Sequence, residues 1–481
     1  MDSIILGGTA QQYATLDLKM ANRHGLIAGA TGTGKTVTLQ VLTEQFSAQG
    51  VPVFLVDVKG DLSGLACAGS AHPKITERLN TIGLSHHHFA AAPVVFWDVF
   101  GKLGQPIRAT VSDIGPLLLA NLLELNDTQT GVLYACFKVA DENGLLMLDL
   151  DDLKAMLKFV SEQAGSLQGQ YGNISSASVG AIMRRLLILE EQGIAAFLGE
   201  PALDLNDMLS CDLSGRGLVN IFNVSQLIHR SPKLYATILL WLLSEVFEAL
   251  PEVGDLAKPK FALFFDEAHL LFAGAPKALV EKIEQIVRLI RSKAVGVFFI
   301  TQSPLDIPSN IAGQLGLKIQ HALRGFSAKD RKTITAVADN FRANPAFDSA
   351  SVIAELGMGE ALISTLDAQG RPTQVARCLI APPMSRIGPA SDEEREEQMC
   401  RSPHRQKYSQ SINRESAYEL LAKTAATTMP ENQQDTTPAH SSRTRQRQGI
   451  AESFFKSVTR AIGSQIGRQL VRGVLGSLFK K

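Results

Sequence analysis

Several features that mark common protein classes are missing from this chain of 481 residues. Its five cysteines are scattered, and no two have the Cys-x-x-Cys spacing of a zinc or redox site. No uninterrupted apolar run reaches the roughly 18 residues of a membrane-spanning helix. The first residues, MDSIILGGTA, lack the basic segment and apolar run of a signal peptide. These absences predict a cytoplasmic protein in a reducing compartment.

An excess of charge of either sign is also missing. The 47 Lys and Arg residues balance 47 Asp and Glu residues, so bulk positive charge does not hold this chain on nucleic acid. A local basic patch is still compatible with this balance. Apolar residues make up 45% and charged residues 20%, which is typical of a soluble globular protein with a sizeable core.

Apolar strands alternate with helical segments along most of the chain. The candidate strands are 25–28, 53–56, 94–97, 218–222, 261–265, 295–300, 318–323, 361–365 and 375–380. Near-continuous apolar strands separated by helices predict an α/β fold with a mostly parallel sheet that is covered on both faces.

These patterns divide the chain into five parts. We predict the first part of an α/β core at 1–104, an inserted, leucine-rich helical subdomain at 105–210, the second part of the core at 211–390, a linker at 391–450 and an amphipathic helix at 451–481. The linker is expected to be disordered, with a short helix around Glu415–Ala422, because residues 430–450 offer almost nothing to bury.

A phosphate-binding loop is the most specific motif of the sequence. Gly29-Ala-Thr-Gly-Thr-Gly-Lys35-Thr36 matches G-x-x-x-x-G-K-[ST] between an apolar strand and a helical pattern. Its glycines let backbone N–H groups point at a phosphate, and the helix adds its positive end. Lys35 is expected to reach the β- and γ-phosphates, and the Thr36 hydroxyl to bind Mg²⁺. The predicted nucleotide-binding residues are Gly29, Ala30, Thr31, Gly32, Thr33, Gly34, Lys35 and Thr36.

Two other strands end in polar residues that suit nucleotide hydrolysis. The strand 261–265 runs into Asp266 and Glu267. We expect Asp266 to hold Mg²⁺ through water and Glu267 to activate the attacking water, so the pair indicates hydrolysis rather than binding alone. The strand 295–300 is followed by Gln302, the candidate sensor or water-positioning residue.

Three residues near these strands have weaker claims. Asp57, which ends the strand 53–56, either binds magnesium-bound water or shapes the turn that follows. Asp61 is expected to serve as a turn or helix-cap residue. His24, just before the first strand, is expected to be structural.

The last residues form a basic amphipathic pattern. Apolar side chains step by four from Phe454 to Leu478, and basic side chains follow the opposite face of the same helix. Residues 453–481 carry six Lys and Arg and no acid. Such a helix can dock on its own core or on a neighbouring subunit, bind DNA or a protein partner, or lie on an anionic membrane surface.

Taken together, the motifs resemble the HerA/FtsK superfamily of P-loop ATPases, and within it the bacterial HerA-like branch that includes YjgR. The resemblance rests on the segments 24–36, 264–269 (FFDEAH), 291–296 (RSKAVG) and 299–304 (FITQSP), with 57–64 (DVKGDLSG) and the C-terminal helix for the narrower branch. It covers most of residues 5–385 and the last thirty residues.

The resemblance implies a RecA-like sheet, ATP and Mg²⁺ as cofactors, a ring-shaped hexamer and ATP-driven movement of DNA as a helicase or translocase. It also implies an arginine finger supplied across the ring; the candidates are Arg291 and Arg324, with Arg288 as a third choice. HerA carries an N-terminal β-barrel, whereas here the phosphate loop starts at Gly29, so we do not expect partner docking through such a barrel.

Three functions fit these observations. The first is an ATP-hydrolysing motor that moves non-sequence-specific DNA as a ring, since the sequence has no recognisable base-reading module. The second is an ATPase adaptor that acts on protein or membrane partners through residues 453–481, without moving DNA. The third is a nucleotide-gated scaffold that hydrolyses ATP slowly.

Overall fold

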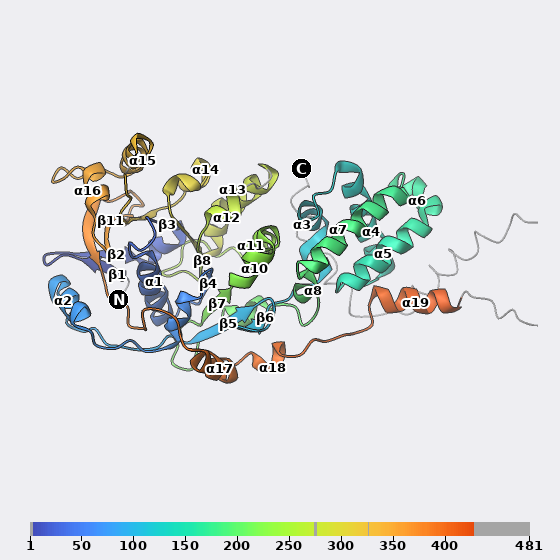
Figure 1. The fold of residues 1–481 in the computed structure, drawn as a ribbon, viewed down its shortest axis with the longest axis horizontal. Helices are drawn as coiled ribbons and strands as arrows, with labels where there is room; N and C mark the ends of the chain where they lie inside the picture. Colours follow the sequence, from blue (N-terminus) through green and yellow to red (C-terminus); the bar gives the residue numbers. More distant parts are fainter. Residues whose placement is uncertain (1–2, 274–276, 326, 428–481) are drawn as a thin grey trace, which may run out of the picture. The chain divides into compact units, whose positions relative to one another are not determined.

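The computed structural model describes residues 3–273, 277–325 and 327–427 (Figure 1). The described chain forms two compact units: residues 3–106 with 204–409, and 107–203 with 410–427. The first unit holds a twelve-stranded sheet, and the second is helical. The predicted α/β fold with a mostly parallel sheet is confirmed.

All strands of the first unit belong to one mixed sheet. Its order is β2 (Tyr13–Asp17), β1 (Ser3–Gly8), β12 (Ala376–Ile380), β11 (Glu360–Ser364), β10 (Leu317–Gln320), β3 (Gly25–Ala28), β9 (Val295–Thr301), β8 (Phe261–Phe265), β4 (Val53–Asp57), β7 (Val219–Asn223), β5 (Val94–Asp98) and β6 (Gln105–Pro106). Neighbours from β10 to β6 are parallel, whereas β11, β12, β1 and β2 are added antiparallel. Every expected strand is present, and β1, β2 and β6 were not predicted.

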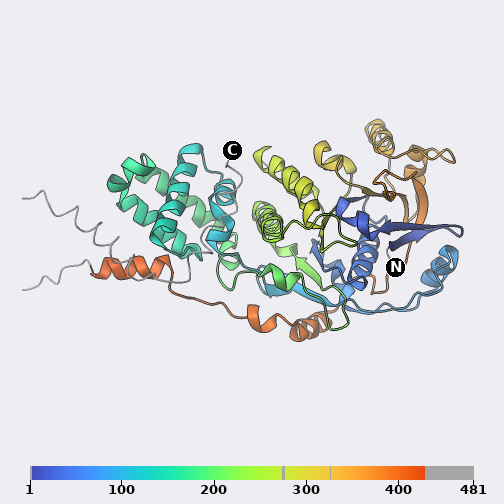
Figure 2. The same cartoon turned by 180° about the vertical axis from the view of Figure 1, so that it is seen from behind.

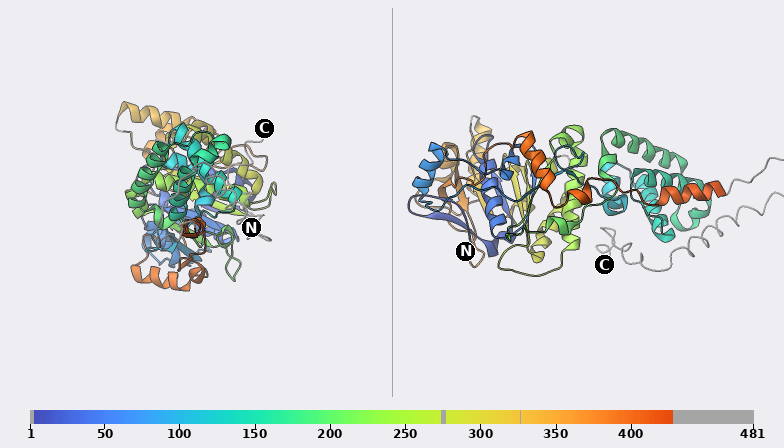
Figure 3. Two further views of the ribbon diagram at one scale, coloured as in Figure 1. Left: turned by 90° about the vertical axis from the view of Figure 1, so that its right-hand side faces the viewer. Right: turned by 90° about the horizontal axis from the view of Figure 1, so that it is seen from below.

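Helices cover both faces of this sheet because the connections run in opposite directions. The connection from β3 to β4 passes through α1 (Lys35–Ala48), whereas α11 (Pro232–Ala249) and α13 (Lys277–Ile290) lead back through β8 to β9. Right-handed crossovers therefore place α1 on one face and the other two helices on the opposite face (Figures 1 and 3). The Phe46 ring of α1 lies 6.1 Å from that of Phe264 and 5.6 Å from that of Phe298, which anchors the first face.

Shorter helices also belong to the first unit, in addition to two at residues 392–408 that are described below. They are η1 (Leu18–Arg23), η2 (Asp61–Ala66), α2 (Pro73–Ile82), α9 (Leu205–Met208), α10 (Ser225–Arg230), α12 (His269–Phe272), η3 (Arg291–Lys293), η4 (Pro304–Asp306), α14 (Ser309–Ala312), α15 (Ala328–Ala338) and α16 (Ser349–Glu355).

The described part of the second unit consists of helices; all but α19 fall within the region expected to be an insertion (Figure 2). They are α3 (Val111–Leu122), α4 (Asp127–Asn143), α5 (Leu150–Glu162), α6 (Ala164–Tyr171), α7 (Ser176–Glu191), α8 (Ile194–Phe197) and α19 (Ala417–Thr427). Asp152 of α5 is fully buried and accepts hydrogen bonds from the Ser416 hydroxyl at 2.5 Å and the Tyr418 N–H at 2.8 Å. These bonds fix the start of α19 to the helical unit.

The prediction of a disordered linker over 391–450 is wrong for its first part, which contains α17 (Asp392–Arg401) and α18 (Arg405–Tyr408). By contrast, α19 agrees with the short helix expected around Glu415–Ala422. Asp392, Glu393 and Glu394 form the first turn of α17, where carboxylates stabilise the positive helix end. Glu394 accepts two hydrogen bonds from Arg386, at 2.6 and 2.8 Å, and Tyr408 is fully buried.

The amphipathic helix predicted over 451–481 lies outside the described residues. Among the helices that are described, none combines the length and the apolar character needed to cross a bilayer.

Candidate functional site

The predicted phosphate loop lies where three parallel strands end. Strand β3 pairs with β9, with Ala28 opposite Thr301, and β9 pairs with β8, with Phe299 opposite Phe265. Because these strands are parallel, the loop after β3, the Asp266–Glu267 pair after β8 and Gln302 after β9 all start at the same edge of the sheet. The structure therefore brings together motifs separated by more than 200 residues in the sequence.

The loop backbone has the form of an anion-binding nest. Gly29 and Gly34 have φ angles of 155° and 116°, and a Cβ on Gly29 would lie 2.5 Å from the His321 side chain. Within this described segment, no N–H group from Thr31 to Thr36 donates to a backbone acceptor. Unpaired N–H groups that gather at a helix start are suited to bind phosphate oxygens.

Lys35 and Thr36 lie at the start of α1 with their side chains held by nearby groups. The Lys35 ammonium donates to the Gly29 carbonyl at 2.6 Å and to the Ala30 carbonyl at 3.0 Å. Burial lowers the pKa of Lys35, while the Glu267 carboxylate acts in the opposite direction. The Thr36 hydroxyl lies 3.4 Å from an Asp61 carboxylate oxygen, so Asp61 contributes a second acidic group beside the predicted Mg²⁺ ligand.

Asp266 and Glu267 occupy the end of β8. Burial, followed by the neighbouring Glu267, raises the pKa of Asp266 to about 7. A carboxyl whose ionisation is disfavoured in this way gains most from a cation, and its oxygen-donor chemistry, with that of Thr36, suits Mg²⁺. Glu267 is 6% exposed and has a φ of 45°, a strained conformation for a residue other than glycine.

Three polar side chains surround the Glu267 carboxylate. One oxygen lies 3.1 Å from the Lys59 ammonium, and the other lies 3.5 Å from the Gln302 amide nitrogen and 3.4 Å from His269 Nδ1. The predicted base and the predicted sensor are thus in contact, and Lys59 is an additional member of the site.

The arginine candidates lie at opposite edges of the sheet. Arg324 lines a hollow of about 450 Å³ together with Ala30 and Gln302, and its guanidinium donates to the Ala354 carbonyl at 3.2 Å. Arg291 precedes β9 and pairs with Asp255 at 3.5 Å. A seven-residue strand spans about 20 Å, so Arg291 and Arg288 lie far from the phosphate loop of their own chain.

Of the two roles considered for Asp57, the hydrogen bonds support the shaping of the turn. Its carboxylate accepts hydrogen bonds from the Gly60 N–H at 2.7 Å and the Leu62 N–H at 3.3 Å, so it shapes the turn after β4. Burial, with the nearby Asp61 charge, raises the pKa of Asp57 to about 7. His24 is structural, as expected: its ring nitrogens contact the Val287 carbonyl at 2.8 Å and the Val297 N–H at 3.1 Å.

Two residues of the site were not predicted from the sequence. Lys59 follows β4, next to Asp57, and its position at a strand end was the signal available. His321 follows β10 and lies behind the loop, where its Nε2 is 2.9 Å from the Thr38 hydroxyl and its Nδ1 is 2.9 Å from the Glu360 carbonyl. Burial lowers the pKa of His321 to about 4, so the ring is neutral at physiological pH.

The phosphate loop opens into a cavity of about 480 Å³. Its lining includes the polar side chains of Lys35, Thr36, Lys59, Lys74, Arg78 and Asp266. It also includes the apolar side chains of Ile75, Met358, Ile380, Pro382, Pro383 and Ile387. A cavity that offers both cationic and apolar side chains suits the phosphates and the base of a nucleotide.

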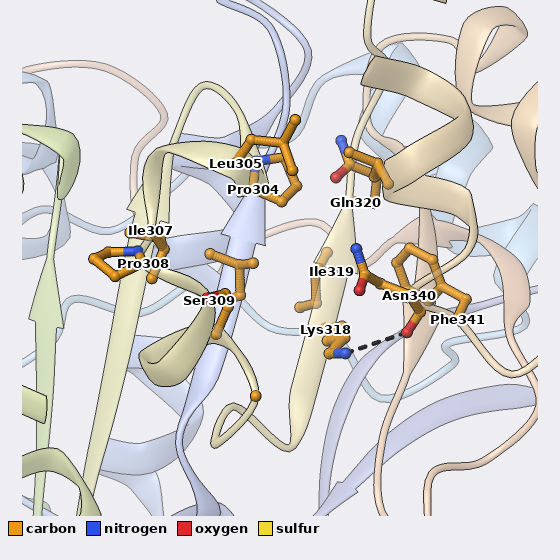
Figure 4. Close-up of a pocket in the computed structure, with 14 residues that line it drawn as sticks. Pro304, Leu305, Ile307, Pro308, Ser309, Lys318, Ile319, Gln320, Asn340 and Phe341 are labelled. Carbon is orange, nitrogen blue, oxygen red and sulfur yellow. Dashed lines mark hydrogen bonds between the residues drawn. The ribbon is translucent and has the colours of Figure 1, made fainter. Parts of the chain in front are cut away.

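A second cavity, of about 390 Å³, lies on the sheet face over β3 and β10, where Figure 4 shows its lining. It is mostly apolar, and Lys318 is the one ionisable side chain among the described residues that line it. The Lys318 ammonium donates to the Asn340 carbonyl at 3.2 Å, the dashed contact in Figure 4. This cavity has no cluster of phosphate- or metal-binding groups, so the candidate site is the one at the phosphate loop.

The fold and the site define a P-loop α/β protein. The chain belongs to the helicase HerA-like C-terminal family, whose profile matches residues 2–481. The predicted relationship to the HerA/FtsK superfamily is therefore confirmed. A search of curated proteins found no match.

Solved structures share the fold at low sequence identity. VirB4 of Thermoanaerobacter pseudethanolicus is 16% identical with a TM-score of 0.50, and the match covers 82% of this chain and 98% of VirB4. The plasmid coupling protein TrwB in complex with the GTP analogue GDPNP is 13% identical with a TM-score of 0.51, covering 81% and 92%. TrwB in complex with ADP and Mg²⁺ is 13% identical with a TM-score of 0.50, covering 80% and 92%.

Proposed function

We propose that this chain is a Mg²⁺-dependent ATP hydrolase that drives a DNA helicase or translocase. The observation that carries the proposal is one cavity that holds an unpaired N–H nest, Lys35, Thr36 and Asp266, with Glu267 beside them. The structure of the similarly folded TrwB with ADP and Mg²⁺ supports the same cofactors here.

Each side chain has a distinct part in this reaction. The loop N–H groups and Lys35 bind the phosphates, and Thr36 and Asp266 hold Mg²⁺. Bound Mg²⁺ neutralises charge on the phosphate oxygens. Glu267 accepts the proton of the attacking water, and Gln302, 3.5 Å from Glu267, orients that water.

The complete site is proposed to form between subunits of a ring, as a hexamer. Arg291 lies at the opposite sheet edge from its own phosphate loop, so it reaches a γ-phosphate only when that phosphate belongs to a neighbour. Arg324 lies at the same edge as Gln302, so it acts on the nucleotide of its own chain or across an interface there. A guanidinium at either place stabilises the charge that develops during transfer.

DNA stimulation tests the motor proposal. ATPase turnover is measured with and without duplex DNA at 50 and 200 mM salt, alongside particle mass in ATP. Phosphate-backbone contacts predict stimulation that weakens steeply as salt rises. An ATPase rate that DNA does not change at either salt concentration contradicts a DNA motor.

A second candidate rests on the basic amphipathic pattern of 453–481. An ATPase adaptor for a membrane or protein partner predicts binding to anionic vesicles that disappears when these residues are deleted. Vesicle binding without DNA stimulation would favour this candidate over the motor.

A further inference from the structure

Lys59 is placed beside the catalytic carboxylate by the fold, not by a chance surface contact. Strand β4 pairs in parallel with β8, with Leu55 opposite Phe264, so the residues after both strands lie side by side. The Asp57 carboxylate then fixes the turn through the Gly60 and Leu62 N–H groups. This turn brings the Lys59 ammonium to 3.1 Å from Glu267.

Lys59 also faces the phosphate cavity. Its side chain is 50% exposed, whereas that of Glu267 is 8% exposed. Lys59 lines the same cavity as Lys35, Thr36 and Asp266. A flexible four-carbon stem lets such an ammonium move between two nearby anions.

The ion pair also occupies the Glu267 carboxylate. One of its oxygens lies 3.1 Å from the Lys59 ammonium, and the other lies 3.5 Å from the Gln302 amide nitrogen. A carboxylate oxygen held by an ammonium has fewer lone pairs left to accept a hydrogen bond from water. An event that moves Lys59 away would therefore free this oxygen for the attacking water.

We propose that Lys59 senses the γ-phosphate: it pairs with Glu267 when no triphosphate is bound, and it turns to the γ-phosphate when ATP binds. This inference rests on the proposed ATP hydrolysis. The triphosphate offers more negative charge than one carboxylate, so it competes for the ammonium. ADP offers no γ-phosphate and leaves Lys59 on Glu267.

The released Glu267 then takes part in a balanced hydrolysis step. The water oxygen forms a bond to the γ-phosphorus while the bond from that phosphorus to the β-phosphate oxygen breaks. The electron pair of the broken bond stays with ADP. The water proton passes to Glu267 and then to the products, so ATP and water give ADP and phosphate.

The first test compares nucleotide affinities of Lys59→Met and wild type in the full chain by calorimetry. We expect binding of a non-hydrolysable ATP analogue to weaken about 10-fold or more, because a charged hydrogen bond is lost, with ADP binding within about twofold of wild type. Lys102→Met is the matched control, since Lys102 is an exposed lysine in a loop at the same sheet edge, outside the cavity. Lys59→Arg should restore part of the preference for the triphosphate.

The second test separates phosphate sensing from a merely structural ion pair. Glu267→Gln frees Lys59, so we expect tighter binding of the ATP analogue, by several-fold, and no such gain in the Lys59→Met, Glu267→Gln double variant. A gain that persists in the double variant, or equal losses for ADP and the analogue in Lys59→Met, overturns the role of Lys59. If the wild type binds neither nucleotide, both this inference and the proposed function are overturned. If it binds and hydrolyses ATP but Lys59→Met keeps the wild-type preference, only this inference is.

Discussion

The two edges of the central parallel strands use their polar groups in different ways. At the amino edge of β3 and β9, both ring nitrogens of His24 are hydrogen-bonded to backbone groups, those of Val287 and Val297. At the carboxyl edge, the N–H groups from Thr31 to Thr36 lack backbone acceptors, and Lys35 contacts the carbonyls of its own loop. We call the amino edge the satisfied edge, because the polar groups of His24 are hydrogen-bonded within the chain. We call the carboxyl edge the unsatisfied edge, because the N–H groups from Thr31 to Thr36 lack backbone acceptors.

The pKa values follow the same division. Burial lowers the pKa of His24 to about 4, which favours the neutral ring that accepts from one backbone group and donates to another. Burial, followed by the neighbouring Glu267, raises the pKa of Asp266 to about 7, although the Lys59 charge acts in the opposite direction. At the carboxyl edge the unfavourable ionisation of Asp266 coincides with unpaired N–H groups, and this combination marks where a charged ligand is to bind.

The largest expected effect comes from removing the lysine of the unsatisfied edge. Lys35→Ala should reduce ATP turnover at least about 100-fold, because the phosphates lose a buried cation in the transition state. Steady-state phosphate release measures the change. Thermal melting should stay near that of wild type, since Lys35 bonds only two loop carbonyls. Undiminished turnover would show that this edge is not the active site.

The arginine candidates test whether a neighbouring chain contributes to the site, Arg291 from the amino edge and Arg324 from the carboxyl edge. Arg291→Lys or Arg324→Lys should keep nucleotide binding and assembly but lose about 100-fold or more of turnover, since lysine lacks the planar fork. Mixing either variant with Lys35→Ala protein should restore some activity if the arginine acts across subunits. Full activity of a monomer would contradict the ring.

His24 tests the satisfied edge directly. His24→Ala should lower the free energy of unfolding by about 2 kcal/mol, because two buried backbone groups lose their partner. Turnover per folded molecule should not change. His229→Ala, at an exposed histidine of α10, is the control and should be nearly neutral. A large loss of turnover with normal stability would mean that the two edges are not divided as described.

Asp57 is expected to give a pH signature in stability. Its pKa of about 7 lies above its usual 3.8, so its contribution to stability is complete below pH 3.8 and is lost as the pH rises through 7. Between pH 4.5 and 6.5 this group should lower the free energy of unfolding by up to about 1.4 kcal/mol per pH unit. Asp57→Asn should flatten that slope in denaturant titrations. An identical slope in both proteins would contradict the raised pKa.

Local patterns predict the carboxyl edge well because each motif is contiguous in the chain. The Gly29–Thr36 loop and the Asp266–Glu267 pair each follow an apolar strand, and parallel strands bring such ends together. Strands β1 and β2 were missed because they are antiparallel additions at the sheet edge, with glycine and polar residues in place of a continuous apolar run.

The parts that escaped prediction depend on contacts between distant residues. His321 supports the loop only because β10 lies beside β3, an adjacency that the sequence does not state. Lys59 forms an ion pair with Glu267, although more than 200 residues separate them in the sequence. The acidic run at 392–397 becomes ordered because its first turn pairs with Arg386 and its helix donates from Gln398 to the Val94 carbonyl of the sheet.

The most direct test of the central claim is ATP turnover and ATP binding of Glu267→Gln measured in the same preparation with Mg²⁺. The account predicts that turnover falls at least about 100-fold while ATP binds at least as tightly as to wild type, because the variant removes the base and keeps the phosphate nest. Asp306→Asn, at a nearby carboxylate that bonds Thr301 and Ser303, is the control and should keep most turnover. Equal turnover in wild type and Glu267→Gln would contradict the assignment of this site as an ATP hydrolase.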